Sequence, residues 1–116
     1  MKTVNILGTE YTVYADNADN PEMKDKWGYC FTDAREIHII DFDTEKEYKD
    51  ESPEVRKRRT DITLRHEIIH AFLIESGLNQ NSMETNCWAK NEEMVDWMAI
   101  QFPKILKVFK EAGCLE

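Results

Sequence analysis

His66 and His70, two histidines four residues apart, are the residues of this sequence best suited to chemistry. On an α-helix, side chains at positions i and i+4 lie on one face, so both imidazoles could bind a single metal ion. Glu67 lies between them and could act as a general base on a nearby water molecule. This H-E-x-x-H arrangement is typical of hydrolytic zinc sites, where it supplies two ligands and a base.

A catalytic zinc site needs a third protein ligand and keeps one position open. His38 is the only other histidine, and it precedes the motif in an expected strand. Glu92 and Asp96 lie four residues apart on one face of an expected helix, so Glu92 could be the third ligand. Asp96 could then accept the free ring N–H of a ligating histidine, which fixes the tautomer. Glu93, about 100° away around the helix, stays open as the alternative third ligand.

Residues 66–70 (H-E-x-x-H) and 91–96 (N-E-x-x-x-D) together resemble the gluzincin signature of thermolysin-type zinc peptidases. The order of a short sheet, a motif helix and a Glu-bearing helix also resembles the small ImmA/IrrE-like peptidases of phages and mobile elements. The second motif ends in Asp where that family has Asn. The resemblance implies a Zn²⁺-dependent endopeptidase with His66, His70 and Glu92 as ligands, acting in regulation or processing on repressor-type targets.

The first forty residues predict a small antiparallel sheet of two hairpins, because short β-rich runs alternate with turn residues. The expected strands are residues 4–7, 11–14, 28–32 and 36–40. Residues 41–51 are almost wholly charged or polar and are expected at the surface. The strand 36–40 is a candidate edge to which an extended peptide could add.

Ser52-Pro53-Glu54 is typical of a helix start, and Gly77 of a helix end. The motif helix therefore spans 53–76, either unbroken or interrupted near residues 60–61, and its expected buried face carries Ile62, Ile69, Leu73 and Ile74. A second helical pattern follows Asn91, and Pro103 either kinks it or begins another helix. We therefore expect an α+β fold: a zincin-like minimal domain with the sheet first, then the H-E-x-x-H helix and a Glu-bearing C-terminal helix pair.

The composition predicts one domain, 1–116, without a signal peptide or membrane helix, and hence a cytoplasmic protein without a membrane partner. The net charge of −8 disfavours nucleic acid. Residues 56–59 (R-K-R-R) are interpreted as a solvated helix face, with a patch for nucleic acid or an acidic partner as the alternative. The three cysteines are too widely spaced for a zinc finger. The three tryptophans are expected in the core, with a substrate platform as the alternative.

The predicted reaction is zinc-dependent hydrolysis of a peptide bond in a protein or peptide substrate, with Glu67 moving the proton. The group that stabilises the oxyanion is left open among Tyr11, Tyr14, Tyr29, Tyr48 and Arg65. Two alternatives are a non-catalytic, zinc-stabilised interaction module and a helical interaction protein without metal. His38 is expected on the solvent face of its strand, with a place in the cleft as the alternative. The substrate and the oligomeric state are left open.

Overall fold

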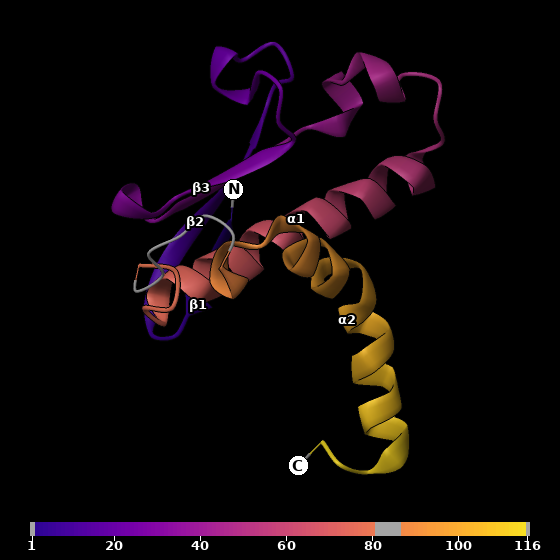
Figure 1. Ribbon diagram of the computed structural model, residues 1–116. Coiled ribbons are helices and arrows are strands. Elements are labelled where there is room, and N and C mark those ends of the chain that lie inside the picture. Colours follow the sequence, from indigo (N-terminus) through magenta and orange to yellow (C-terminus); the bar gives the residue numbers. More distant parts are fainter. Residues whose placement is uncertain (1, 81–86, 116) are drawn as a thin grey trace.

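The computed structural model describes residues 2–80 and 87–115 and has an α+β architecture (Figure 1). A four-stranded sheet in the N-terminal part is followed by two long helices, α1 (Pro53–Glu75) and α2 (Glu92–Ala112). Helix α1 packs on one face of the sheet, and α2 packs against α1. The strands are β1 (Lys2–Ile6), β2 (Thr9–Asp16), β3 (Gly28–Phe31) and β4 (Glu36–Ile40).

The sheet is mixed, which corrects the expectation of a purely antiparallel sheet. The two expected hairpins, β1–β2 and β3–β4, are both present, but β2 pairs with β4 in parallel and the order is β1-β2-β4-β3. Strand β4 carries three buried isoleucines at 37, 39 and 40, which suits an internal strand. Residues 36–40 are therefore not an edge, and β3 occupies that position instead.

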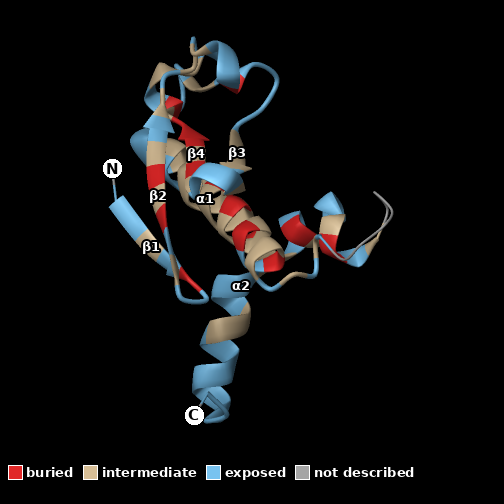
Figure 2. Cartoon of the chain, turned by 90° about the vertical axis from the view of Figure 1, so that its left-hand side faces the viewer, coloured by how far each residue is buried: buried red, intermediate tan, exposed pale blue. Residues whose placement is uncertain are grey.

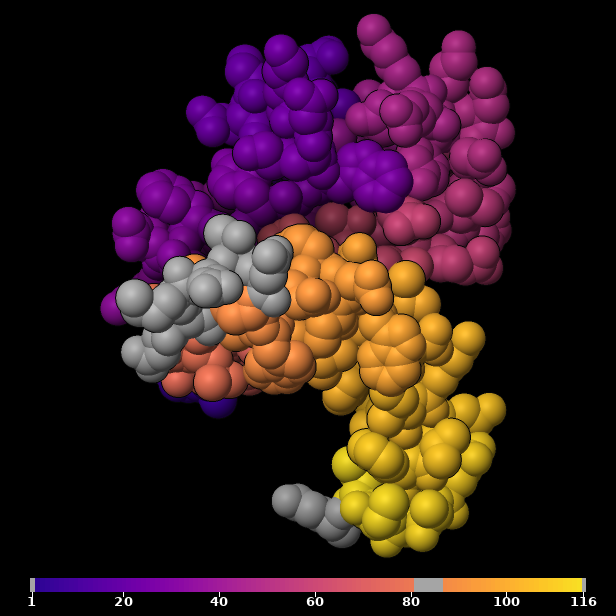
Figure 3. Space-filling view, viewed as in Figure 1, coloured from indigo at the N-terminus to yellow at the C-terminus, as the bar shows by residue number. Residues whose placement is uncertain are grey.

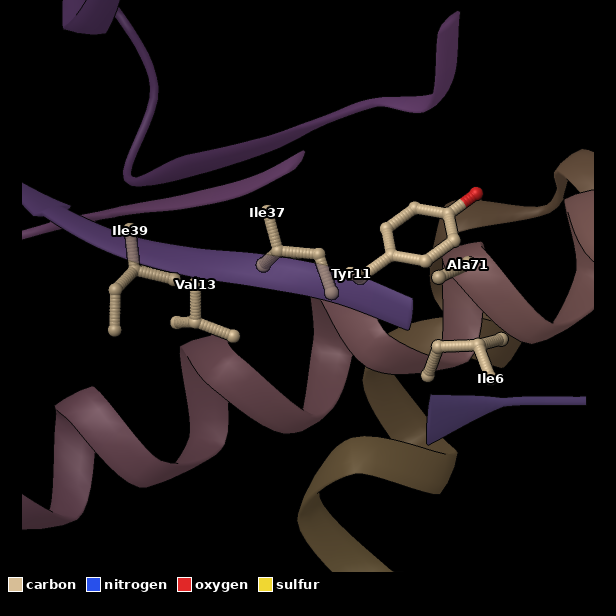
Figure 4. Close-up of a cluster of buried hydrophobic side chains, with 6 residues drawn as sticks. All are labelled: Ile6, Tyr11, Val13, Ile37, Ile39 and Ala71. Carbon is tan, nitrogen blue, oxygen red and sulfur yellow. The ribbon is translucent and has the colours of Figure 1, made fainter. Parts of the chain in front are cut away.

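The main core lies between the sheet and α1 (Figure 4). Its fully or almost fully buried members are Ile6, Tyr11, Val13, Ile37, Ile39 and Ala71. The Tyr11 hydroxyl donates a hydrogen bond of 2.7 Å to Glu75 at the end of α1. Burial, followed by this bond, raises the pKa of Tyr11, so the phenol stays protonated and ties the helix end to the sheet.

Helix α1 is continuous, without a break near residues 60–61. Ser52 caps its start by accepting the Val55 N–H at 3.3 Å, and Gly77 adopts a positive φ of 85° just after its end. The face toward the sheet is marked by Thr63, Glu67 and Ala71, which are one turn apart and all buried. Figure 2 shows the buried parts of α1 in red. Residues 41–51 were expected at the surface, but Phe42 within this segment is buried, with 2% of its surface exposed.

Helix α2 is a single helix that runs through Pro103, so the expected C-terminal helix pair is wrong. Proline cannot donate the backbone hydrogen bond that the Ala99 carbonyl would normally accept. Arg65 of α1 donates its Nε–H to that carbonyl instead, which satisfies the buried group and ties the helices together. Beyond Pro103 the helix leads away from the sheet and is mostly exposed (Figures 1 and 2).

Neither helix within the described ranges combines the length and the apolar character needed to cross a bilayer.

The contact between Arg65 and Ala99 can be tested by a double-mutant cycle with Pro103. Arg65→Met leaves a buried carbonyl without a donor and should lower the free energy of unfolding by about 1–3 kcal/mol, measured by urea denaturation. In a Pro103→Ala background, the restored backbone N–H at position 103 can satisfy the carbonyl, so Arg65→Met should cost less. An equal cost in both backgrounds would contradict this account.

Candidate metal centre

The structure brings His66, His70 and Glu92 together at the crossing of α1 and α2. The two histidine Nε2 atoms lie 3.1 Å apart, and the Glu92 carboxylate lies 3.2 Å from His66 Nε2 and 2.9 Å from His70 Nε2. In a tetrahedral site with bonds of about 2.0–2.1 Å, the donor atoms are about 3.3 Å apart. The three donors therefore have a spacing that could hold one metal ion.

Glu92, rather than Glu93, completes this group. Glu93 lies around the helix in a separate hollow lined by Trp88, Met94 and Trp97. The Glu92 side chain is 67% exposed. It faces the histidines at the mouth of the site. The position of Glu92 on the helix face shared with Val95 and Ala99 had instead predicted that it points into the interior.

Asp96 lies one turn after Glu92 and accepts a hydrogen bond from His66, with 2.7 Å between Oδ1 and Nδ1. Because Nδ1 is the donor in this bond, the other ring nitrogen of His66, Nε2, is left as the atom that faces His70 and Glu92. The contact expected for Asp96 is therefore present, and it fixes the tautomer and orientation of His66.

Glu67 is buried under β3, with 6% of its surface exposed. A Cβ atom at Gly28 would lie 3.1 Å from the Glu67 carboxylate and 2.9 Å from the His38 carbonyl oxygen, so this close approach requires glycine. Burial raises the pKa of Glu67 to about 7, and the neighbouring carboxylates add to the effect. Its Oε1 lies 3.9 Å from His66 Nε2, beside the candidate metal position.

Burial also lowers the pKa of His70, which favours the neutral imidazole that a metal ion requires. Cys30, next to Glu67 on the inner face of β3, has its thiol pKa raised by burial to about 12. This thiol is therefore kept protonated and is a poor metal ligand or nucleophile.

A cleft of about 940 Å³ opens onto these residues. It is bounded by β3 and the loop that precedes it, by α1 and by the start of α2. Figure 3 shows the hollow between the purple N-terminal part and the orange start of α2. Ile62 and Ile74 of α1, which were expected to pack in the core, line this cleft instead.

His38 does not line the cleft. It lies on the sheet face opposite α1, stacked between the rings of Tyr14 and Tyr29 at centroid distances of 4.9 and 4.6 Å. Its two ring nitrogens bond the carboxylates of Asp16 and Glu36 at 2.7 and 2.9 Å. The expected solvent-face position is confirmed, but the side chain is only 13% exposed.

Of the five candidates for oxyanion stabilisation, only Tyr29 contributes to the cleft lining, but its ring stacks on His38 on the sheet face opposite α1. Arg65 is engaged with the Ala99 carbonyl, and Tyr11 with Glu75. Tyr14 stacks on His38 and Tyr48 packs on Trp27 and Phe42.

Two cleft residues, Trp27 and Arg59, were missed as site residues by the sequence analysis. Trp27 is 36% exposed, and Trp88 and Trp97 are more than half exposed, so the expectation of buried tryptophans is wrong. Arg59 belongs to the basic run 56–59, but it points into the cleft with its guanidinium carbon 4.9 Å from the Trp27 ring centroid. The only signal was its spacing, two helical turns before His66.

Comparison of the chain with protein-family models, curated proteins and solved structures gave no match.

The raised pKa of Glu67 predicts how the stability of the chelator-treated protein depends on pH. The folded state holds this proton up to about pH 7 and the unfolded state only to about 4.5, so folding binds a proton in between. Raising the pH through this window should lower the free energy of unfolding, by up to about 3 kcal/mol. Glu67→Gln stays neutral and should be more stable than wild type above the window, but not below it.

Thermal unfolding of the two proteins at one pH below this window and one pH above it would measure the difference in stability. Glu93→Gln, at an exposed position, is the control. A wild-type slope retained in Glu67→Gln would contradict the assignment of the proton to Glu67.

Proposed function

We propose that this protein is a zinc-dependent endopeptidase that hydrolyses peptide bonds of a protein substrate. The observation that carries the proposal is the convergence of His66, His70 and Glu92 from two helices, with Glu67 beside them. The zincin-like order of sheet, motif helix and Glu-bearing helix, and the resemblance to gluzincins, support the same reading. The resemblance to ImmA/IrrE-like peptidases favours a regulatory or processing role in a phage or mobile element.

The donor set fits zinc better than the hard cations Mg²⁺ and Ca²⁺. Two imidazoles and one carboxylate form the His₂Glu combination used by catalytic zinc, whereas Mg²⁺ and Ca²⁺ prefer oxygen ligands throughout. Asp96 behind His66 adds the second contact that is typical of a zinc-ligating histidine.

A zinc ion in this site would make a water molecule more acidic and polarise the scissile carbonyl. Glu67 would accept the proton of that water and transfer it to the leaving amine. The burial of Glu67 under Gly28 raises its pKa in the metal-free protein, which favours its role as a proton carrier.

Strand β3 supplies a place for the substrate backbone. It is the terminal strand on its side of the described sheet and lines the cleft through residues 28–30. An extended peptide could add to its free edge by main-chain hydrogen bonds, which would hold a peptide bond close to Glu67. Recognition through the backbone suits a protein substrate.

The competing hypothesis is a zinc ion that only stabilises the fold of an interaction module. Structural sites close all four positions with protein ligands and need no general base. Here, three donors lie at the mouth of a cleft, and a buried glutamate lies beside them. This arrangement favours the peptidase.

Elemental analysis of tag-free protein tests the metal centre. The wild type should bind about one zinc per chain, and Glu92→Ala should lose most of it because a third donor is removed. Glu93→Ala is the matched control on the same helix turn and should keep the metal. Equal zinc content in both variants would overturn the assignment of Glu92, and no zinc in the wild type after zinc addition would overturn the proposed function.

Glu67→Gln separates the metal from the chemistry. This variant should retain zinc but lose peptide cleavage by at least about two orders of magnitude, because the proton acceptor is gone while the ligands stay. Cleavage of a denatured protein substrate, followed by mass spectrometry, measures the loss. Activity at the wild-type level would refute the role of Glu67.

A further inference from the structure

Three cations line the cleft outside the candidate metal centre, Lys24, Lys26 and Arg59, and two of these, Arg59 and Lys26, lie close to aromatic rings. Arg59 lies on α1 two turns before His66, about 10 Å away along the helix axis. Lys26 lies two residues before Gly28, the residue that touches Glu67. Each of these two cations lies over an aromatic ring: the Arg59 guanidinium carbon is 4.9 Å from the Trp27 centroid, and Lys26 Nζ is 5.1 Å from that of Tyr29.

Neither Arg59 nor Lys26 forms an ion pair within residues 2–80 and 87–115. The neighbours of Arg59 in the same basic run show the contrast, because Arg56 pairs with Asp43 and Lys57 with Asp61, both at 2.7 Å. Arg58 of the same run also forms no ion pair with the described residues, so what distinguishes Arg59 is its position in the cleft over Trp27.

The Trp27 ring holds the Arg59 guanidinium in a defined orientation. Trp27 itself is fixed by edge contacts with Phe42 and Tyr48, at centroid distances of 5.6 and 5.9 Å, and Phe42 is buried. A guanidinium that lies over an indole ring keeps its N–H groups directed outward in the guanidinium plane. Those N–H groups match the two oxygens of a carboxylate in a bidentate pair.

The cleft as a whole does not select for negative charge. Outside the metal centre its walls carry three acidic side chains, Asp25, Glu45 and Glu47, against Lys24, Lys26 and Arg59. Glu45 is engaged in its own turn, where it accepts the Glu47 N–H at 3.3 Å. Selection would therefore act on one carboxylate at one place and not on the net charge of the substrate.

We propose that Arg59 on its Trp27 platform forms a subsite that binds a carboxylate of the substrate. The subsite rests on the proposed function for its position relative to the cleaved bond, which would lie about three residues of extended chain away. The carboxylate is either an acidic side chain or the C-terminus of a peptide. Arg59 is thereby a specificity-determining residue, and it has no part in the metal centre.

The test uses zinc-loaded Glu67→Gln protein, so that bound peptides stay intact, and fluorescence anisotropy. The probes are two labelled, C-terminally amidated peptide pools that differ only in carrying Glu or Gln at one scanned position. The Glu pool should bind about tenfold more tightly at one position, as expected for a charge-assisted bidentate pair. Adding Arg59→Gln should abolish this preference, whereas Arg58→Gln, an exposed cation next to it, should keep it.

A third pool with Gln and a free C-terminus identifies the source of the carboxylate. A preference for this pool that depends on Arg59 means that the subsite takes a chain end; a preference for the Glu pool alone means an acidic side chain. Equal binding of all pools, no binding, or equal losses in Arg59→Gln and Arg58→Gln would overturn the subsite.

Wild-type cleavage of the same pools keeps the two proposals apart. Carboxylate-dependent binding without any cleavage would reject the peptidase and retain the subsite. Cleavage of all pools without a preference that depends on Arg59 would retain the peptidase and reject the subsite.

Discussion

The structure depends on one close approach, that of strand β3 to helix α1 at Gly28. Because position 28 has no Cβ, the strand lies directly on Glu67 and covers its carboxylate. That contact buries the acid and raises its pKa, and it also brings the free edge of β3 along the same face of α1 that carries His66 and His70. The burial of the base and one wall of the cleft therefore follow from a single packing contact.

Much of the fold could be predicted from local signals. The turn residues predicted the β1–β2 and β3–β4 hairpins, and Ser52 and Gly77 predicted where α1 begins and ends. The parallel pairing of β2 with β4 could not be predicted, because the order of strands depends on which strand is buried on both sides. The continuation of α2 through Pro103 could not be predicted either. The Ala99 carbonyl accepts its hydrogen bond from Arg65, which belongs to a different helix.

The candidate site was predictable as far as spacing along one helix determines geometry. His66, Glu67 and His70 follow from the helical period, and Asp96 follows from Glu92 in the same way. The choice between Glu92 and Glu93 depended on how α2 crosses α1, which the sequence could not fix alone. The buried face of α1 was misjudged because it contains the polar Thr63 and Glu67, whereas Ile62 and Ile74 line the cleft.

The crossing of the two helices has a thermodynamic consequence. The two histidines lie on consecutive turns of one helix, but Glu92 follows His70 by 22 residues and reaches it only because α2 is docked on α1. Docking keeps the third donor at a high effective concentration near the first two. By linkage, an ion that binds all three donors stabilises docking by the same free energy that docking adds to its binding. Apolar contacts such as that of Val95 with Leu73 would thus add to the affinity of the proposed site for a metal ion without touching it.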